Sequence, residues 1–130
     1  MYLGDKHIAV EHPKSISRYY RDSNLLYAHF KVEQEIEVPD VKLAMAVYEE
    51  YCSENPPLRL IEFGEFCTVT SEARQFISEN IKPAIAEAIV IYSLAQKLLV
   101  KFYLNFRKQQ HPVKVFSTVK DAIKWLDSFI

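Results

Sequence analysis

The stretch from Leu58 to Phe76, LRLIEFGEFCTVTSEARQF, constrains the fold of this chain more than any other. Its first six residues predict a buried strand, Gly64-Glu65 predicts a loop, and Thr70-Ser71-Glu72 predicts the start of a helix. A strand that leads through a short loop into a helix is typical of α/β folds. Because free backbone N–H groups and the helix dipole both point at the loop, this stretch is also a natural place for a binding site.

The residues before this stretch predict a β-hairpin followed by a helix. The segments 16–20 and 25–32 flank the turn-forming residues 21–24, and the second segment alternates apolar and polar residues. Residues 8–10 offer a further short strand. Asp40 is a suitable N-cap for the helix, whose apolar positions recur at helical spacing: Val41, Ala44, Val47, Tyr48 and Tyr51.

The residues after this stretch continue the alternation of strands and helices. The segment 87–92 contains the unbroken apolar run Ala88–Ile91, which is typical of a strand buried on both faces. Ser93 is placed to cap a third helix that runs to about Lys108, and 113–116 predicts a short strand. Thr118 and Asp121 resemble a capping box for the last helix.

This order of elements predicts one α/β domain over residues 1–130, with about four helices. An N-terminal antiparallel hairpin would extend one side of a mixed sheet, and alternating α-β units would place the last three strands mainly in parallel.

Composition narrows the classes of function. The chain has 130 residues, of which 49% are hydrophobic and 25% charged, and this balance is typical of a globular domain. A net charge of −1 supplies no electrostatic attraction to nucleic acid or to an anionic membrane. The N-terminus does not have the pattern of a secretory signal, and two cysteines without a metal-type spacing favour the cytoplasm.

The chemistry-bearing residues do not form an enzymatic motif. Cys52 and Cys67 have no motif spacing to any of the four histidines, so we interpret both as structural residues. The acidic, histidine and cysteine residues show no recognised metal-ligand spacing, and two glycines are too few for a phosphate-binding loop. The sequence therefore predicts a protein that is not an enzyme and that holds no cofactor or metal.

The central stretch resembles the STAS superfamily, the fold of bacterial anti-sigma-factor antagonists. In that family a strand carrying an Asp leads to Asp-Ser-Ser-Gly at a helix start. Here Glu62 takes the place of the strand Asp, Thr70 stands before the position of the phosphorylated serine, and Ser71 stands at that position. The segments SEARQF, AEAIVIYSLAQKLLVKFYLNF and PVKVFSTVKDAIKWL are similar to an uncharacterised bacterial STAS-like subgroup.

The resemblance implies a regulatory site at Thr70, Ser71 and Glu72, with Ser71 as the phosphorylated residue. Phosphorylation would add about −1.5 to −2 charges at a helix N-terminus, where backbone N–H groups would receive them. The alternative is that Thr70 or Ser71 only caps the helix, a contribution of roughly 1 kcal/mol.

The third helix is apolar nearly all the way around. If Leu94, Leu98, Phe102 and Phe106 pack against the sheet, then Val100 and Leu104 point away from it, with Tyr103 beside them. Lys97, Lys101 and Arg107 would surround this second face. We expect Val100, Tyr103 and Leu104 to form an interaction patch, covered either by the N-terminal segment or by another subunit or partner.

Two functions remain open from the sequence. The first is a non-enzymatic cytoplasmic regulatory module that binds a protein partner or forms a homodimer. The second is a small-molecule or lipid-binding domain with a pocket between the sheet and the helices. A large apolar pocket would favour the second, and a flat apolar patch on the third helix would favour the first.

Overall fold

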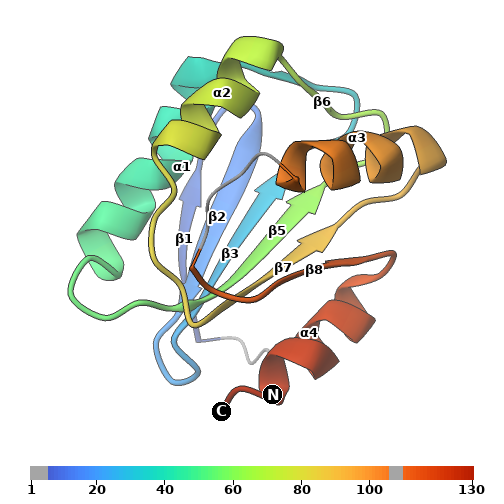
Figure 1. Cartoon of the computed structure of the whole chain (residues 1–130). Helices are drawn as coiled ribbons and strands as arrows, with labels where there is room; N and C mark the ends of the chain where they lie inside the picture. The colour runs from blue at the N-terminus through green and yellow to red at the C-terminus, as the bar shows by residue number, and fades with distance from the viewer. Residues whose placement is uncertain (1–5, 106–109) are drawn as a thin grey trace.

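A computed structural model describes residues 6–105 and 110–130 of the chain, without the side chains of residues 102 and 103. Its main element is a six-stranded mixed sheet with the strand order β1-β2-β3-β5-β7-β8 (Figure 1). The strands are β1 (Ile8–Glu11), β2 (Ser15–Tyr20), β3 (Leu25–Phe30), β5 (Leu58–Phe63), β7 (Ala86–Val90) and β8 (Val113–Phe116).

Pairing within the sheet is antiparallel in the N-terminal part and parallel in the C-terminal part, as the sequence predicted. The strands β1, β2 and β3 pair antiparallel, whereas β3, β5, β7 and β8 pair parallel to one another. The predicted hairpin is confirmed, with Tyr20 opposite Leu25 at its turn. The mixed α/β fold that the sequence predicted is therefore the observed one.

Four helices flank the sheet in the described part of the chain: α1 (Val38–Tyr51), α2 (Ser71–Glu79), α3 (Leu94–Leu104) and α4 (Val119–Asp127). Figure 1 shows α1 and α2 together, with α4 apart from them at the other end of the molecule. Thr118 caps α4, because its hydroxyl accepts a hydrogen bond from the backbone N–H of Asp121 at 3.1 Å.

The helix α4 packs on one face of the sheet and forms a dense core there. Ala122 and Leu126 are fully buried against side chains that alternate along the parallel strands. The strand residues of this core are Tyr20, Leu25, Tyr27, Leu58, Leu60, Ala86, Ala88 and Val90. Burying this much apolar surface is the main stabilising term of the fold.

The opposite face of the sheet carries α1 and α2 on two further clusters. Tyr19 and Leu26 pack against Val47, Tyr48 and Cys52 near the C-terminal end of α1. The second cluster of buried residues lies between α1, α2 and the ends of the strands. It contains Phe30, Ile36, Val41, Cys67 and Ala73.

Three details of the fold differ from the sequence prediction. Asp40 is not the N-cap of α1: the helix begins at Val38, and Asp40 accepts a hydrogen bond from the backbone N–H of Glu37 at 2.8 Å. Two short strands were not predicted, since β4 (Glu35–Ile36) pairs parallel with β6 (Thr68–Val69) between the predicted elements. The third helix ends at Leu104, before the predicted end at Lys108, which lies outside the described residues.

The orientation of α3 is the reverse of the predicted one. Leu94 and Leu98, which we expected against the sheet, are 71% and 60% exposed. Val100 and Leu104, which we expected to point away, are half-buried. The hydroxyl of Ser93 caps the helix at the backbone N–H of Gln96, and the Gln96 side chain turns inward to the loop after β5. This contact fixes the rotation of the helix about its axis.

Candidate functional site

A cavity of about 190 Å³ lies between the sheet and the helices α2 and α3. The cavity lies on the face of β5 and β7 that is opposite α4, and one side of α3 borders it. The wall is almost entirely apolar, and its apolar residues include Ile61, Phe63, Val69, Ile77, Ile89, Ile91, Leu99 and Val100. The side of α3 that borders the cavity contributes Ala95, Gln96, Leu99 and Val100 to its lining.

A second cavity of about 100 Å³ lies beside the first, under α1 and α2. Ile61, Phe63, Ile77 and Glu87 line both cavities. The two spaces are therefore neighbours along one face of the sheet.

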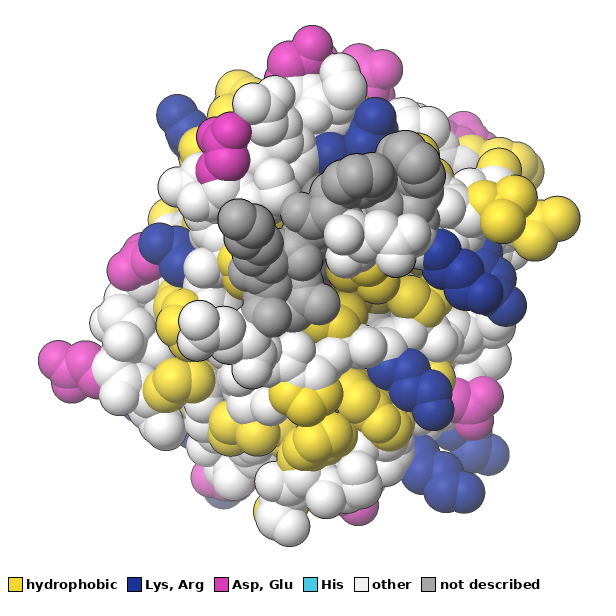
Figure 2. Space-filling model, viewed as in Figure 1, with side chains coloured by type: hydrophobic (Ala, Val, Ile, Leu, Met, Phe, Trp, Pro, Cys, Tyr) yellow, Lys and Arg dark blue, Asp and Glu magenta, His cyan; other side chains and the backbone are white. Residues whose placement is uncertain are grey.

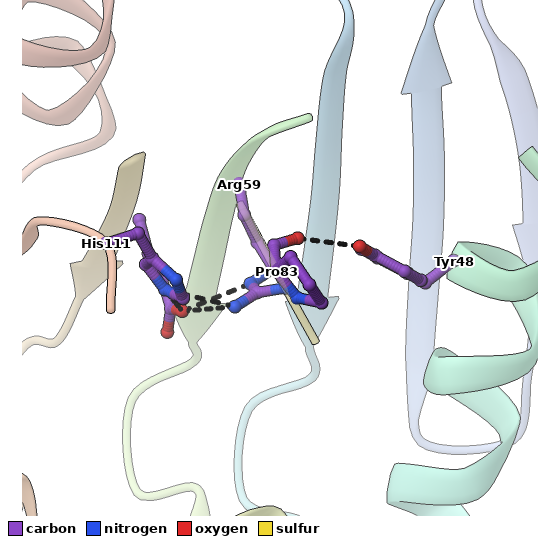
Figure 3. A network of polar contacts seen from close by, with 5 residues as sticks. Tyr48, Arg59, Pro83 and His111 are labelled. Carbon is purple, nitrogen blue, oxygen red and sulfur yellow. Dashed lines mark hydrogen bonds and ion pairs between the residues drawn. The ribbon is translucent and has the colours of Figure 1, made fainter. Parts of the chain in front are cut away.

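A buried ion cluster stands where the two cavities meet (Figure 3). Arg59 and Glu87 are directly opposite each other in the register of β5 and β7. The Arg59 guanidinium donates two hydrogen bonds to Glu87 Oε1, from Nη2 at 2.6 Å and from Nε at 3.1 Å. His111 Nε2 lies 3.0 Å from the same oxygen. Glu87 is completely buried, so this pairing is what makes its charge tolerable inside the protein.

The helix α1 supports this cluster from the side. The Tyr48 ring lies under the Arg59 guanidinium, with the Cζ atom 6.0 Å from the ring centroid. The Tyr48 hydroxyl donates a hydrogen bond of 2.7 Å to the backbone carbonyl of Pro83 (Figure 3). The cluster thereby connects three elements, namely β5 through Arg59, β7 through Glu87 and α1 through Tyr48.

Arg74 and Gln96 line the first cavity from the side of the central loop. The Gln96 amide donates to the backbone carbonyls of Gly64 and Cys67, at 3.1 and 2.9 Å. The Arg74 guanidinium donates to the backbone carbonyl of Val69 at 2.6 Å. These contacts tie α2 and α3 to the segment that follows β5.

A second polar cluster lies on the other face of the sheet, around the buried Glu62. The hydroxyls of Tyr27 and Tyr92 each donate a hydrogen bond to one of its carboxylate oxygens, and His29 Nε2 is 3.8 Å from Oε1. Burial, reinforced by the bond to Glu62, raises the pKa of Tyr92 to about 12 and the pKa of Tyr27 further still. Glu62, which takes the place of the strand Asp in the STAS pattern, is therefore held by phenols on the face opposite the cavities.

The predicted regulatory residues lie at the start of α2. Thr70 is the N-cap, and its hydroxyl accepts a hydrogen bond from the backbone N–H of Ala73 at 3.1 Å. Ser71 and Glu72 are the first two residues of the helix, and both are exposed. The capping role of Thr70 is established by this geometry, whereas phosphorylation of Ser71 stays a prediction.

Of the three residues of the predicted interaction patch, the structure describes the side chains of Val100 and Leu104, and neither is fully exposed. Val100 lines the first cavity, and Leu104 is half-buried. The side chain of Tyr103 lies outside the described residues, as do the side chain of Phe102 and the whole of Phe106 and Arg107. The exposed apolar residues of α3 are instead Leu94, Leu98 and Leu99.

Both cysteines are buried. Burial raises the pKa of each thiol to about 11, so both are protonated at neutral pH. Cys67 lines the first cavity, and Cys52 packs under α1. Across residues 6–105 and 110–130, no three His, Cys, Asp or Glu side chains are grouped to hold a metal ion. None of the helices in these ranges is long and apolar enough to cross a membrane.

The sequence alone did not reveal the cavities or the ion cluster. Arg59 and Glu87 lie 28 positions apart, and neither belongs to a motif. Their signal was a charged residue at the second position of each of two mainly apolar strands.

A model for a domain of unknown function, DUF7793, matches residues 19–130. The chain belongs to this family. No curated protein matches the DUF7793 chain. Among solved structures it is similar to an uncharacterised protein of the DUF3478 family with a SpoIIAA-like fold, from Shewanella loihica PV-4, with 17% identity and a TM-score of 0.56. That similarity covers 97% of this DUF7793 chain and 99% of the Shewanella chain. The predicted STAS-like fold is thereby confirmed.

Proposed function

We propose that this DUF7793 chain is a non-catalytic binding domain for a small, mainly apolar molecule. The observation that carries this proposal is the cavity of about 190 Å³ under α3, with its apolar wall. The cavity is partly open to solvent, and its wall is almost entirely apolar, so a molecule with an apolar body that entered it would remove this surface from water.

The volume limits the size of the ligand. An apolar cavity of about 150 Å³ is known to stay dry and to bind benzene. By the same measure, this cavity accepts a single aromatic ring with a short substituent, or a chain of roughly six to eight carbons. The neighbouring cavity gives such a molecule room to extend past Ile61 and Phe63.

The chemistry of the wall supports binding over catalysis. The thiol of Cys67 faces an apolar environment and is protonated at neutral pH, whereas a nucleophilic cysteine needs a lowered pKa. The buried Glu87 is bound to Arg59 and His111, which makes it a structural group.

Thermal denaturation with 1-octanol tests the proposal, because a ligand that binds only the folded state raises the melting temperature. We expect 1-octanol to stabilise the wild type and Leu98→Trp, in which the new ring lies on the exposed side of α3. Val100→Trp places the same ring inside the cavity and should abolish the shift. Equal shifts in the two variants, or none in the wild type, would contradict the proposal.

Thiol alkylation gives an independent measurement on the unmodified chain. Cys67 lines the cavity, and Cys52 is buried elsewhere with a similarly raised pKa. We expect saturating 1-octanol to slow the reaction of Cys67 with N-ethylmaleimide more than that of Cys52. A uniform slowing would indicate general stabilisation and not occupancy of the cavity.

A second candidate function is the regulatory protein-interaction role, and the outer side of α3 favours it. Leu94 and Leu98 are exposed on this side, with Lys97 and Lys101 beside them. In Figure 2 apolar side chains protrude at the end of α3 at the right of the view, next to Lys or Arg side chains. Scattered surface leucines are common, but neighbouring ones on a helix are typical of contact surfaces.

Light scattering tests this second function. If the wild type is a dimer through α3, then changing Leu94 and Leu98 together to Glu should give a folded monomer. Val100→Glu, on the buried side of the same helix, should instead destabilise the fold. A monomeric wild type would refute the homodimer.

A further inference from the structure

We infer that the ligand of the first cavity carries a carboxylate, and that Arg74 binds it. This inference rests on the proposed binding function and names the chemical class of the ligand: a monocarboxylic acid with an apolar body of roughly six to eight carbons.

The charges around the cavities point to an anion. The charged residues that line the two spaces are Arg59, Arg74, Lys82 and Glu87. Arg59 is paired with Glu87, and Lys82 Nζ lies 2.7 Å from Glu49 Oε1. Across the described ranges, no carboxylate lies within ion-pair distance of Arg74. Within those ranges, Arg74 is therefore the one charged lining residue without a counterion, and its charge is positive.

Arg74 is also held in place. It lies in the first turn of α2, and its Nη1 donates to the Val69 carbonyl at 2.6 Å. This bond uses one of the five N–H donors of the guanidinium and fixes its position beside the cavity. A planar guanidinium fixed in this way suits the two oxygens of a carboxylate.

The two charged groups that line the cavity lie at opposite ends of it. Glu87 is the second residue of β7, and Ile91 follows the end of that strand. Four residues of strand separate them by about 13 Å. Arg74 belongs to the segment that follows the carboxyl end of β5, so it lies at the Ile91 end. A ligand can place its carboxylate at Arg74 and its chain along Ile89, toward the end where Glu87 is already paired with Arg59.

This arrangement distinguishes three probes with the same eight-carbon body. Octanoate carries a negative charge, opposite to that of Arg74. 1-Octanol is neutral, and octylamine carries a positive charge like that of Arg74. Hydrogen bonds between the Arg74 guanidinium and the carboxylate add to the binding free energy, so we expect octanoate to bind roughly tenfold more tightly than 1-octanol. Octylamine should bind more weakly than either.

Calorimetric titration of the whole chain tests the assignment. In Arg74→Gln the preference for octanoate over 1-octanol should disappear, while the affinity for 1-octanol stays the same. Arg74→Lys should retain part of the preference, because it keeps the charge and loses the planar fork. Arg21→Gln removes the same charge from the turn between β2 and β3, far from the cavity lining, and should behave like the wild type.

The outcomes separate this inference from the proposed function. If the wild type binds octanoate and 1-octanol equally, or if Arg74→Gln weakens both equally, then the carboxylate assignment is wrong and the apolar site stands. If octylamine binds best, the sign of the charge is wrong. If none of the three binds the wild type, both the inference and the proposed function fall.

Discussion

Replacing Glu87 by Leu should destabilise this protein more than most single changes. Glu87 is completely buried and accepts two hydrogen bonds from Arg59, while His111 lies 3.0 Å from the same oxygen. The change leaves the Arg59 guanidinium, itself only 9% exposed, without its counterion. Removing one partner of a buried ion pair costs about 3–5 kcal/mol.

A double variant shows whether the loss of stability comes from the broken Arg59–Glu87 ion pair or from changed side-chain packing. When Arg59→Met is added to Glu87→Leu, the guanidinium is removed together with its counterion and only the His111 imidazole loses a partner, so we expect the free energy of unfolding to return to within about 1–2 kcal/mol of the wild type. The Met side chain can fill the space beside Tyr48.

Urea denaturation of the wild type, both single variants and the double variant gives the coupling energy directly. A coupling below about 0.5 kcal/mol would refute the reasoning, since that is the limit expected for independent sites. A loss of less than about 1 kcal/mol in Glu87→Leu would also contradict it, because a guanidinium buried without a partner cannot cost so little.

Three further predictions concern other parts of the chain. Gly64→Ala should lower the free energy of unfolding by about 1–3 kcal/mol in urea denaturation, because its new Cβ would lie 2.6 Å from the backbone nitrogen of Val32. Ser71→Asp should leave the melting temperature unchanged or slightly raised, since an acid at the first residue of α2 suits the helix dipole. The wild type should lose stability as the pH rises from 9 to 11, because the unfolded chain releases the Cys52 proton near pH 9 and the folded chain retains it to about 11. Cys52→Ala should reduce the slope by about 1 kcal/mol per pH unit, and an equal slope would contradict the assignment.

The sequence predicted the elements of this fold because each has a strong local pattern. The alternation in residues 25–32, the apolar run Ala88–Ile91 and the capping residues Thr70 and Thr118 each act over a few neighbouring positions. Their structural outcomes, the strands β3 and β7 and the capped helices α2 and α4, follow from those local preferences. The short strand β4 was missed because a two-residue pairing leaves no periodic pattern.

The orientation of α3 could not be derived in the same way. Leu94 and Leu98 on one side are as apolar as Val100 and Leu104 on the other, so burial of apolar surface does not choose between them. The choice is made by Gln96, whose amide reaches two carbonyls of the loop after β5. A polar contact between segments 30 positions apart is invisible to helical periodicity, and the cavity that depends on this rotation was hidden for the same reason.

The unequal packing of the two sheet faces has a consequence for how this family can change. On the α4 side, Leu126, Leu60 and Ala88 are fully buried in one cluster, so a larger side chain there must be matched by changes in its neighbours. On the α3 side the wall residues already border an open volume, and a larger or smaller side chain alters that volume without straining the layer behind it. Relatives can therefore diverge in cavity shape while the α4 layer keeps the chain folded. Under the proposed binding function, one scaffold can in this way give rise to proteins with different ligands.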